Sequence, residues 1–265
     1  SYNNSDLDFI VWPEASFPYL YHEKLEWFHN VCRGFLEDGT YLVMGAVRED
    51  RTASKIYNSI VVIDHLGKNV LSYDKMHLVP FGEYVPFRAF IPSAFQSIAG
   101  SIGDFDVGES PKVLTINGLK FALSICYEAA FPENFLLKDD DWQQLDALIN
   151  ITNDAWFGPT SQPYQHLQIV RCRSIEAGLP LIRCTNYGIS AVFDACGREI
   201  CMIDMNTFGA VDFFIPKKTT APTPYSKYGD TIFWIMILLL FLISAASTIK
   251  STSQKVYKRI LAQLN

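Results

Sequence analysis

Residues 121–131, with the sequence FALSICYEAAF, contain the change of pattern from which the fold of this chain can be worked out. The run at 121–125 is short and mostly apolar, which is typical of a strand inside a protein. At Cys126, Tyr127 and Glu128 it gives way to a thiol, a phenol and a carboxylate. Cys126 is therefore either one more small core residue or a nucleophile at the end of a buried strand.

Short apolar runs of the same kind recur along the chain and alternate with helical patterns. The spacing of apolar residues predicts helices at 21–36 and 163–177, the second of which stops at Gly178. Turn residues at 64–67 and 194–197 predict hairpins. The predicted strands are 7–12, 41–47, 57–63, 70–73, 113–116, 120–125, 147–151, 181–185, 190–194 and 210–214. This mixture favours a layered α/β domain with sheets inside and helices outside.

The composition excludes several classes of protein. A chain of 265 residues can form one large domain or two small ones, and 49% hydrophobic residues exclude a disordered chain. The net charge of −6 gives no reason to expect a nucleic-acid partner, because a phosphate backbone calls for a basic surface. The six cysteines include no CxxC pair, and His77 and His166 lack metal-ligand spacing, so we expect no metal.

An uncharged run near the C-terminus gives the clearest physical signal. Residues 232–249 (IFWIMILLLFLISAASTI) would form a helix about 27 Å long, close to the thickness of a bilayer's hydrocarbon core. We predict a transmembrane helix there. The surrounding lysines and arginines mildly favour a cytoplasmic C-terminus, with the main domain on the other side of the membrane. Because Ser1 is not a start methionine, we also expect an N-terminal portion to be missing.

Three of the predicted strands lead into an acid, a base and a thiol. LDFIVWPEAS (7–16) leads to Glu14, NVLSYDK (69–75) to Lys75, and FALSICYE (121–128) to Cys126. Functional groups gather past the carboxyl ends of strands in α/β sheets, so the three side chains could meet in space. Glu14 could then take the thiol proton. Lys75 and the N–H of Tyr127 could stabilise the charge that builds on a substrate carbonyl oxygen, which would complete a site for acyl transfer.

Residues 87–111 are rich in proline, glycine, serine and phenylalanine and show no sustained period. A loop this long in a compact domain favours a functional segment such as a lid. The apolar side chains of Phe87, Phe90, Ile91 and Phe95 would suit contact with a membrane or an acyl chain. The alternative is a loop that packs on its own domain.

Five stretches in this order resemble the carbon–nitrogen hydrolase (nitrilase) superfamily. They are WPEAS (12–16), YDKMHLVPFGEYVP (73–86), SICYE (124–128), NITNDAWFG (150–158) and RCTNYGISAVFDACG (183–197). The second stretch, NDAWFG and the TPYSKYGD (223–230) that leads into the apolar run are more similar to one membrane-bound branch, the bacterial apolipoprotein N-acyltransferases. The resemblance extends over about residues 8–249.

The resemblance implies a fold, a domain organisation and a set of site residues. It implies a four-layer α-β-β-α sandwich over residues 1–225, followed over 226–265 by one transmembrane helix and a short cytoplasmic tail. Further transmembrane helices would precede the catalytic domain in the full protein. The triad would be Glu14 as general base, Lys75 as oxyanion stabiliser and Cys126 as nucleophile. The supporting or substrate-binding residues would be Glu83, Tyr127, Glu128 and Trp156.

The implied reaction is an N-acyl transfer without a cofactor. Cys126 would take a fatty acyl chain from a phospholipid as a thioester, and the N-terminal amine of a diacylglyceryl-apolipoprotein would accept it. The resemblance implies a monomer in the bacterial inner membrane, with the catalytic domain on the periplasmic face. A thioester must be shielded from water until the amine arrives, which suits an apolar lid and a membrane tether. The alternatives are a membrane-tethered amidase or nitrilase with the same triad, and a non-enzymatic binding module on this scaffold.

Overall fold

A computed structural model describes residues 7–22, 25–87, 104–109, 113–132 and 144–264 of the chain. The chain divides into two units, Ser1–Thr223 and Pro224–Asn265, and each is described by itself. Most of the loop at 87–111, including Phe90, Ile91 and Phe95, lies outside the described residues. The lid therefore stays a prediction.

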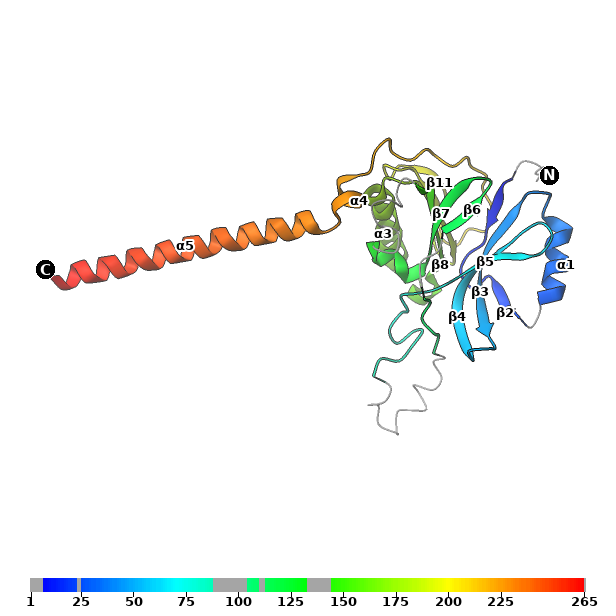
Figure 1. The fold of residues 1–265 in the computed structure, drawn as a ribbon, viewed down its shortest axis with the longest axis horizontal. Helices are drawn as coiled ribbons and strands as arrows, with labels where there is room; N and C mark the ends of the chain where they lie inside the picture. Colours follow the sequence, from blue (N-terminus) through cyan, green and yellow to red (C-terminus); the bar gives the residue numbers. More distant parts are fainter. Residues whose placement is uncertain (1–6, 23–24, 88–103, 110–112, 133–143, 265) are drawn as a thin grey trace. The chain divides into compact units, whose positions relative to one another are not determined.

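Two β-sheets form the middle of the first unit (Figure 1). The first has the strand order β1-β3-β4-β5, with β2 beside β3. Its strands are β1 (Phe9–Val11), β2 (Phe17–Leu20), β3 (Tyr41–Asp50), β4 (Lys55–Ile63) and β5 (Asn69–Asp74). The second has the order β11-β10-β9-β8-β7-β6. Its strands are β6 (Val113–Ile116), β7 (Leu119–Ile125), β8 (Ala147–Asn153), β9 (Leu181–Asn186), β10 (Ser190–Phe193) and β11 (Glu199–Ile203).

Strand directions bring several strand ends to common edges. In the second sheet β7, β8 and β9 are mutually parallel, so their carboxyl ends meet at one edge. In the first sheet β1 is parallel to β3, and β4 is antiparallel to both β3 and β5. β1 and β5 therefore run in the same direction and end towards the same side of their sheet. Of these strands, β1 precedes Glu14, β5 precedes Lys75 and β7 precedes Cys126.

Helices cover the two outer faces of the sandwich. α1 (Leu25–Phe35) lies on the first sheet and α3 (Gln162–Ala177) on the second, at opposite sides in Figure 1. Side chains alternate along the strands, so that Leu42 and Met44 of β3 join the cluster under α1 while Val43 packs between the sheets. The layers are therefore α-β-β-α, which confirms the predicted fold. α3 ends at Gly178, where a φ of +65° suits glycine.

The strand predicted at 210–214 is wrong, because these residues form no ladder with a neighbouring strand. The mostly apolar run that indicated a strand there contacts the core between the sheets without pairing. Phe213 packs against the core between the sheets, whereas Phe214 is 97% exposed. Contact with the core alone satisfies such a pattern, so an extended segment can show it without any strand pairing.

Two strands of the structure lie outside the predicted ones. β2 contains Pro18, which has no N–H to donate to a ladder and argues against a strand from sequence. It is nevertheless compatible with the position of β2, which pairs only with β3. β11 pairs in antiparallel fashion with β10 and completes the hairpin predicted at 194–197.

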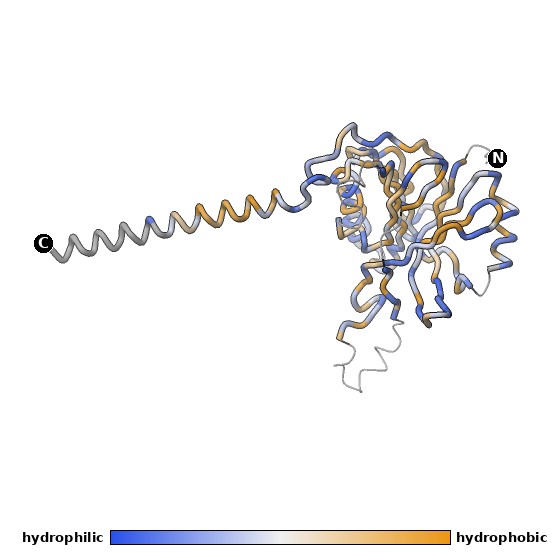
Figure 2. The backbone as a smooth tube through the Cα atoms, viewed as in Figure 1, coloured by the Kyte–Doolittle hydropathy of each residue, from blue (hydrophilic) through white to orange (hydrophobic). Residues whose placement is uncertain are grey.

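The second unit is helical. It contains α4 (Pro224–Tyr228) and α5 (Thr231–Leu264). Within α5 the window Thr231–Thr248 has a mean hydropathy of 2.2, and it is long and apolar enough to cross a membrane by length and composition. Figure 2 shows this hydrophobic stretch along the first part of α5. It coincides in position with the span predicted at 232–249.

Candidate active site

A break along the edge of the first sheet positions Glu14. β1 pairs with β3 at residues 41–43 and β2 pairs with it at residues 46–47. The loop between β1 and β2 therefore runs beside β3 at Gly45. The Gly45 N–H donates to the Pro13 carbonyl oxygen (3.1 Å), and a Cβ at position 45 would lie 2.5 Å from the Glu14 Cα. Because Gly45 has no side chain, the loop can lie against β3. Glu14 is buried there, with 5% of its surface exposed.

Lys75 follows β5 directly and lies between two carboxylates. Its Nζ is 2.9 Å from Glu83 Oε2 and 3.7 Å from Glu14 Oε1, and the residue is 1% exposed. Burial lowers the pKa of Lys75, but the negative charges of Glu14 and Glu83, and of Cys126 in its thiolate form, outweigh it and leave the pKa above its ordinary value. The ammonium is therefore a fixed positive charge with Glu83 as a direct partner, and the supporting role of Glu83 stays a prediction.

Asn58, which belongs to none of the predicted site residues, joins the carboxylates of Glu14 and Glu83. Its side-chain amide donates to Glu14 Oε1 (2.7 Å) and to Glu83 Oε1 (2.8 Å), while its backbone carbonyl accepts from the Lys75 N–H (2.9 Å). A polar side chain within the apolar strand β4 could have indicated a site residue in the sequence, since Asn58 is buried there. A single asparagine thus orients both acids and the start of the Lys75 segment.

Cys126 is the first residue after β7 and opens the short 3₁₀ helix η4 (Cys126–Ala130). Its φ is +51°, a region that non-glycine residues rarely occupy, at a cost of about 1 kcal/mol or more. Burial and the charge of Glu14 raise the pKa of the Cys126 thiol to about 12, while Lys75 acts in the opposite direction. The thiol is therefore protonated at neutral pH and needs a base before it can attack.

The backbone N–H of Asn153, at the end of β8, links the acid and the thiol. It donates to Glu14 Oε2 at 2.7 Å, and its hydrogen bond to Cys126 lowers the pKa of that thiol. Glu14 and Lys75 come from the first sheet and Cys126 from the second. The three residues that lie far apart in the sequence therefore meet in one buried site, as their strand ends predict.

Glu128 connects the segment after Lys75 with the strand before Cys126. Its carboxylate accepts the N–H groups of Met76 (2.6 Å), His77 (3.2 Å) and Ile125 (2.7 Å), together with the Tyr73 hydroxyl (2.9 Å). Burial raises the pKa of Glu128, and these hydrogen bonds oppose that rise. Glu128 thus links the two loops, and its supporting role in the site stays a prediction.

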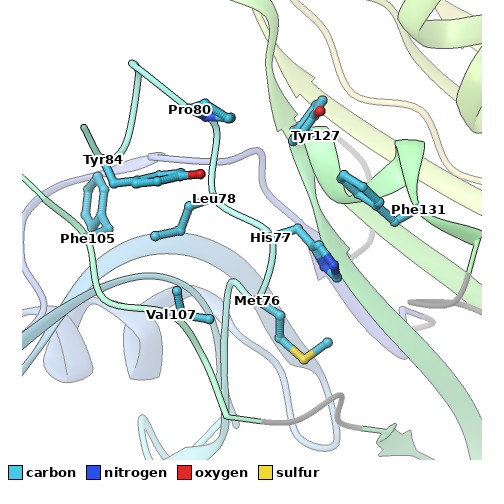
Figure 3. A pocket seen from close by; sticks show the side chains of 9 residues that line it. All are labelled: Met76, His77, Leu78, Pro80, Tyr84, Phe105, Val107, Tyr127 and Phe131. Carbon is cyan, nitrogen blue, oxygen red and sulfur yellow. The ribbon is translucent and has the colours of Figure 1, made fainter. Parts of the chain in front are cut away.

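An apolar cavity of about 380 Å³ adjoins the site (Figure 3). Met76 follows Lys75 in the chain and Tyr127 follows Cys126, whereas Glu14, Lys75 and Cys126 are not among the described lining residues. The His77 and Phe131 rings stack at a centroid distance of 4.3 Å. In Figure 3, Tyr127 and Phe131 lie across the cavity from Leu78 and Tyr84. The lining residues are Met76, His77, Leu78, Pro80, Tyr84, Phe105, Val107, Tyr127 and Phe131.

Trp156 occupies a different position. It lies on the short 3₁₀ helix η7 (Asp154–Phe157), is 73% exposed, and is absent from the described lining of the cavity. Its supporting or substrate-binding role stays a prediction. Within the described part of the chain, no three histidine, cysteine, aspartate or glutamate side chains converge in a way that would hold a metal ion.

The sequence places this site in a known family. Residues 2–225 match the model of the carbon-nitrogen hydrolase family. The chain belongs to that family. Solved structures of this carbon–nitrogen hydrolase fold include Saccharomyces cerevisiae Nit3, a member of branch 10 of the nitrilase superfamily, with a TM-score of 0.56 at 19% identity over 76% of this chain and 74% of that one. An amidase from Nesterenkonia sp. gives a TM-score of 0.54 at 20% identity, over 76% and 75%. At such identities the likeness shows the fold alone.

Relatives of higher identity point to one branch of the carbon–nitrogen hydrolases. An apolipoprotein N-acyltransferase of Rhizobium meliloti is 41% identical over 91% of this chain and 46% of that protein. A protein of the same name from Brucella melitensis is 37% identical over 91% and 45%. The chain therefore spans about half the length of the curated relatives it matches.

Proposed function

We propose that this carbon–nitrogen hydrolase is an N-acyltransferase. It moves a fatty acyl chain from a phospholipid, through a Cys126 thioester, to the N-terminal amine of a diacylglyceryl-cysteine in an apolipoprotein. The observation that carries the proposal is the apolar cavity beside the Cys126 and Lys75 loops, because an acyl chain needs an apolar site next to the nucleophile. The names of the relatives with 37–41% identity support the same reaction.

The first half-reaction acylates the thiol. Glu14 takes the proton from Cys126, and the thiolate attacks the ester carbonyl carbon of the phospholipid. The positive charge of Lys75 and the N–H of Tyr127 stabilise the oxyanion that forms. The C–O bond then breaks, and Glu14 returns the proton to the leaving oxygen, which releases a lysophospholipid. Because burial and the charge of Glu14 raise the pKa of the Cys126 thiol to about 12, the thiol keeps its proton until Glu14 accepts it.

The second half-reaction regenerates the thiol. The amine of the acceptor attacks the thioester carbonyl, a C–N bond forms and the C–S bond breaks. Glu14 takes the proton that the amine loses and delivers it to the departing thiolate. The site is deeply buried, since Cys126, Lys75 and Glu14 are all less than 10% exposed. Exclusion of water keeps the thioester intact between the two steps.

The setting of the reaction is part of the proposal. Residues 1–225 form the catalytic domain, and residues 226–265 hold one transmembrane helix and a short cytoplasmic tail. The apolar window of α5 would keep the site near its phospholipid donor. We propose further that the full protein is a monomer with more transmembrane helices before the catalytic domain, and that this domain lies on the periplasmic face of a bacterial inner membrane.

Intact mass spectrometry tests the proposed reaction. After incubation with phospholipid, the full chain is expected to gain the mass of one acyl chain, and a lipopeptide with a free diacylglyceryl-cysteine amine should remove it. Free fatty acid that accumulates at the same rate without the acceptor would indicate instead an amidase-like enzyme that uses water. Absence of any acyl-enzyme, with or without acceptor, would leave a binding module as the remaining alternative.

Gly45→Ala is expected to displace the base without removing it. The new methyl group would overlap backbone atoms of Pro13 and Glu14, so we expect a loss of stability of about 1–3 kcal/mol and about 100-fold slower formation of the acyl-enzyme. Gly34→Ala on α1 is the matched control, because no heavy atom lies within 4 Å of its new Cβ and alanine favours a helix. Thermal unfolding and intact mass follow the two effects. A Gly45→Ala protein that acylates at the wild-type rate would contradict the role given to this loop.

A further inference from the structure

A buried polar network lies beneath the nucleophile, on the α3 side of the second sheet, and the proposed reaction does not use it. Arg183 of β9 donates hydrogen bonds to Asn150 Oδ1 (3.0 Å), Thr152 Oγ1 (3.2 Å) and Asp154 Oδ2 (2.7 Å). The side chains of Arg183 and Asp154 are completely buried. Burial of such charges is costly even when they are paired. A network of this kind at the carboxyl ends of β8 and β9 therefore indicates a role beyond packing.

The network reaches the nucleophile through His166 of α3. Its Nδ1 lies 2.9 Å from Asp154 Oδ1, and its Nε2 lies 3.3 Å from the carbonyl oxygen of Cys126. A carbonyl oxygen only accepts, so Nε2 carries the proton in this hydrogen bond. The Phe157 ring packs edge-on against the imidazole, with centroids 5.9 Å apart, and helps to fix its plane.

The backbone of Cys126 needs such support. Its positive φ of +51° is strained for a residue with a side chain, and strain of this kind persists only where surrounding contacts maintain it. On the preceding side, Glu128 accepts the Ile125 N–H (2.7 Å). His166 supplies the second contact, at the carbonyl of Cys126 itself. The strained turn is thus held on both sides of the residue that carries the thiol.

We infer that His166 is a positioning residue for the nucleophile. Its hydrogen bond to the Cys126 carbonyl holds the strained turn, which keeps the thiol aligned with Glu14. Asp154, itself fixed by Arg183, lies 2.9 Å from Nδ1 and fixes the orientation of the imidazole from its other side. The inference rests on the proposed function in one respect, namely that Cys126 is the group that takes the acyl chain.

Glutamine and asparagine separate this role from packing. The Nε2 of glutamine can replace the imidazole Nε2 as donor to the Cys126 carbonyl, whereas asparagine is too short to reach it. We expect His166→Gln to form the acyl-enzyme within about fivefold of the wild-type rate, and His166→Asn to be about 100-fold slower with an unchanged KM for phospholipid. His29→Asn is the matched control, because it removes a histidine that contacts Tyr21 (3.3 Å) in the α1 layer. It should acylate at the wild-type rate.

A second readout does not depend on the lipid. Iodoacetamide labels Cys126 and the exposed Cys172 in the same sample, and the ratio of the two rates reports the position of the Cys126 thiol. His166→Asn should change this ratio about fivefold or more, and His166→Gln should restore it. If the wild type forms no acyl-enzyme but the ratio responds as expected, the proposed function fails and the positioning role stands.

Two results would overturn the inference. One is a wild-type acylation rate and labelling ratio in both His166 variants. The other is an equal loss in both variants that follows the loss of folded protein in thermal unfolding. Either result would mean that the donor at Nε2 does not control the geometry of the thiol.

Discussion

Cys126→Ala is expected to abolish formation of the acyl-enzyme. The thiol is the only group in the proposed mechanism that can hold the acyl chain, and loss of a nucleophile typically costs about 10⁴-fold or more in rate. Intact mass after incubation with phospholipid should therefore show no added acyl chain. Circular dichroism should show that the variant is folded, since the side chain is small and lies at the end of β7.

Two other cysteines provide matched controls for that experiment. Cys172 is exposed on α3, so its removal should leave acylation at the wild-type rate. Cys184 on β9 is the stricter control, because burial raises the pKa of its thiol to about 12, as it does for Cys126. The Cys184 thiol donates to the Val11 carbonyl (3.3 Å) and is not expected to act as a nucleophile. Full acylation of the Cys126→Ala protein would contradict the proposed role of Cys126 as nucleophile.

Glu14→Gln is expected to slow acyl-enzyme formation by about 10²–10⁴-fold, because it removes the proposed base for the thiol proton. The same change should make the thiol more acidic. The charge of Glu14 helps to raise the pKa of Cys126, so a neutral amide lowers that pKa. Below its pKa a thiol gains thiolate about tenfold per pH unit. At a fixed alkaline pH, the variant should therefore react faster with iodoacetamide while it transfers acyl chains more slowly.

The pH dependence of Cys126 alkylation measures the predicted change in the pKa of the thiol. The wild-type rate should rise steadily up to the region of pH 12, and the Glu14→Gln profile should lie at lower pH. Lys75→Met is the counterpart, because Lys75 lowers the pKa of the thiol and its loss should move the profile to higher pH. Profiles for the two variants that move in the same direction would contradict the arrangement of charges described for the site.

The sequence predicts most of the fold because strands buried on both faces are short, apolar runs. β6 (Val113–Ile116) is predicted to the residue, and the helix at 163–177 differs from α3 by one residue. The prediction of strands fails where the sequence does not show which segments pair in a sheet. Residues 210–214 form a mostly apolar run that pairs with no neighbouring strand, and β2 pairs with β3 in spite of Pro18.

The candidate site shows the same limit. Glu14, Lys75 and Cys126 stand out because each carries a reactive group just after an apolar run. Asn58 and His166 act through hydrogen bonds to partners 25 to 44 residues away in the chain. No local pattern marks such a partner, because an asparagine within a strand or a histidine on a helix is consistent with many structures. Only the packed layers bring them to the site.

The contribution of both sheets to the site has a mechanical consequence. The base and the ammonium are attached to one sheet and the thiol to the other, with an apolar interior that includes Val43 and Ile125 between them. A small sliding of one sheet over the other would leave every strand intact and yet separate the acid from the sulfur. The rate of the proposed acyl transfer therefore depends strongly on the relative position of the two sheets. Mild denaturation should abolish the proposed acyl transfer before spectroscopic probes of secondary structure detect any change.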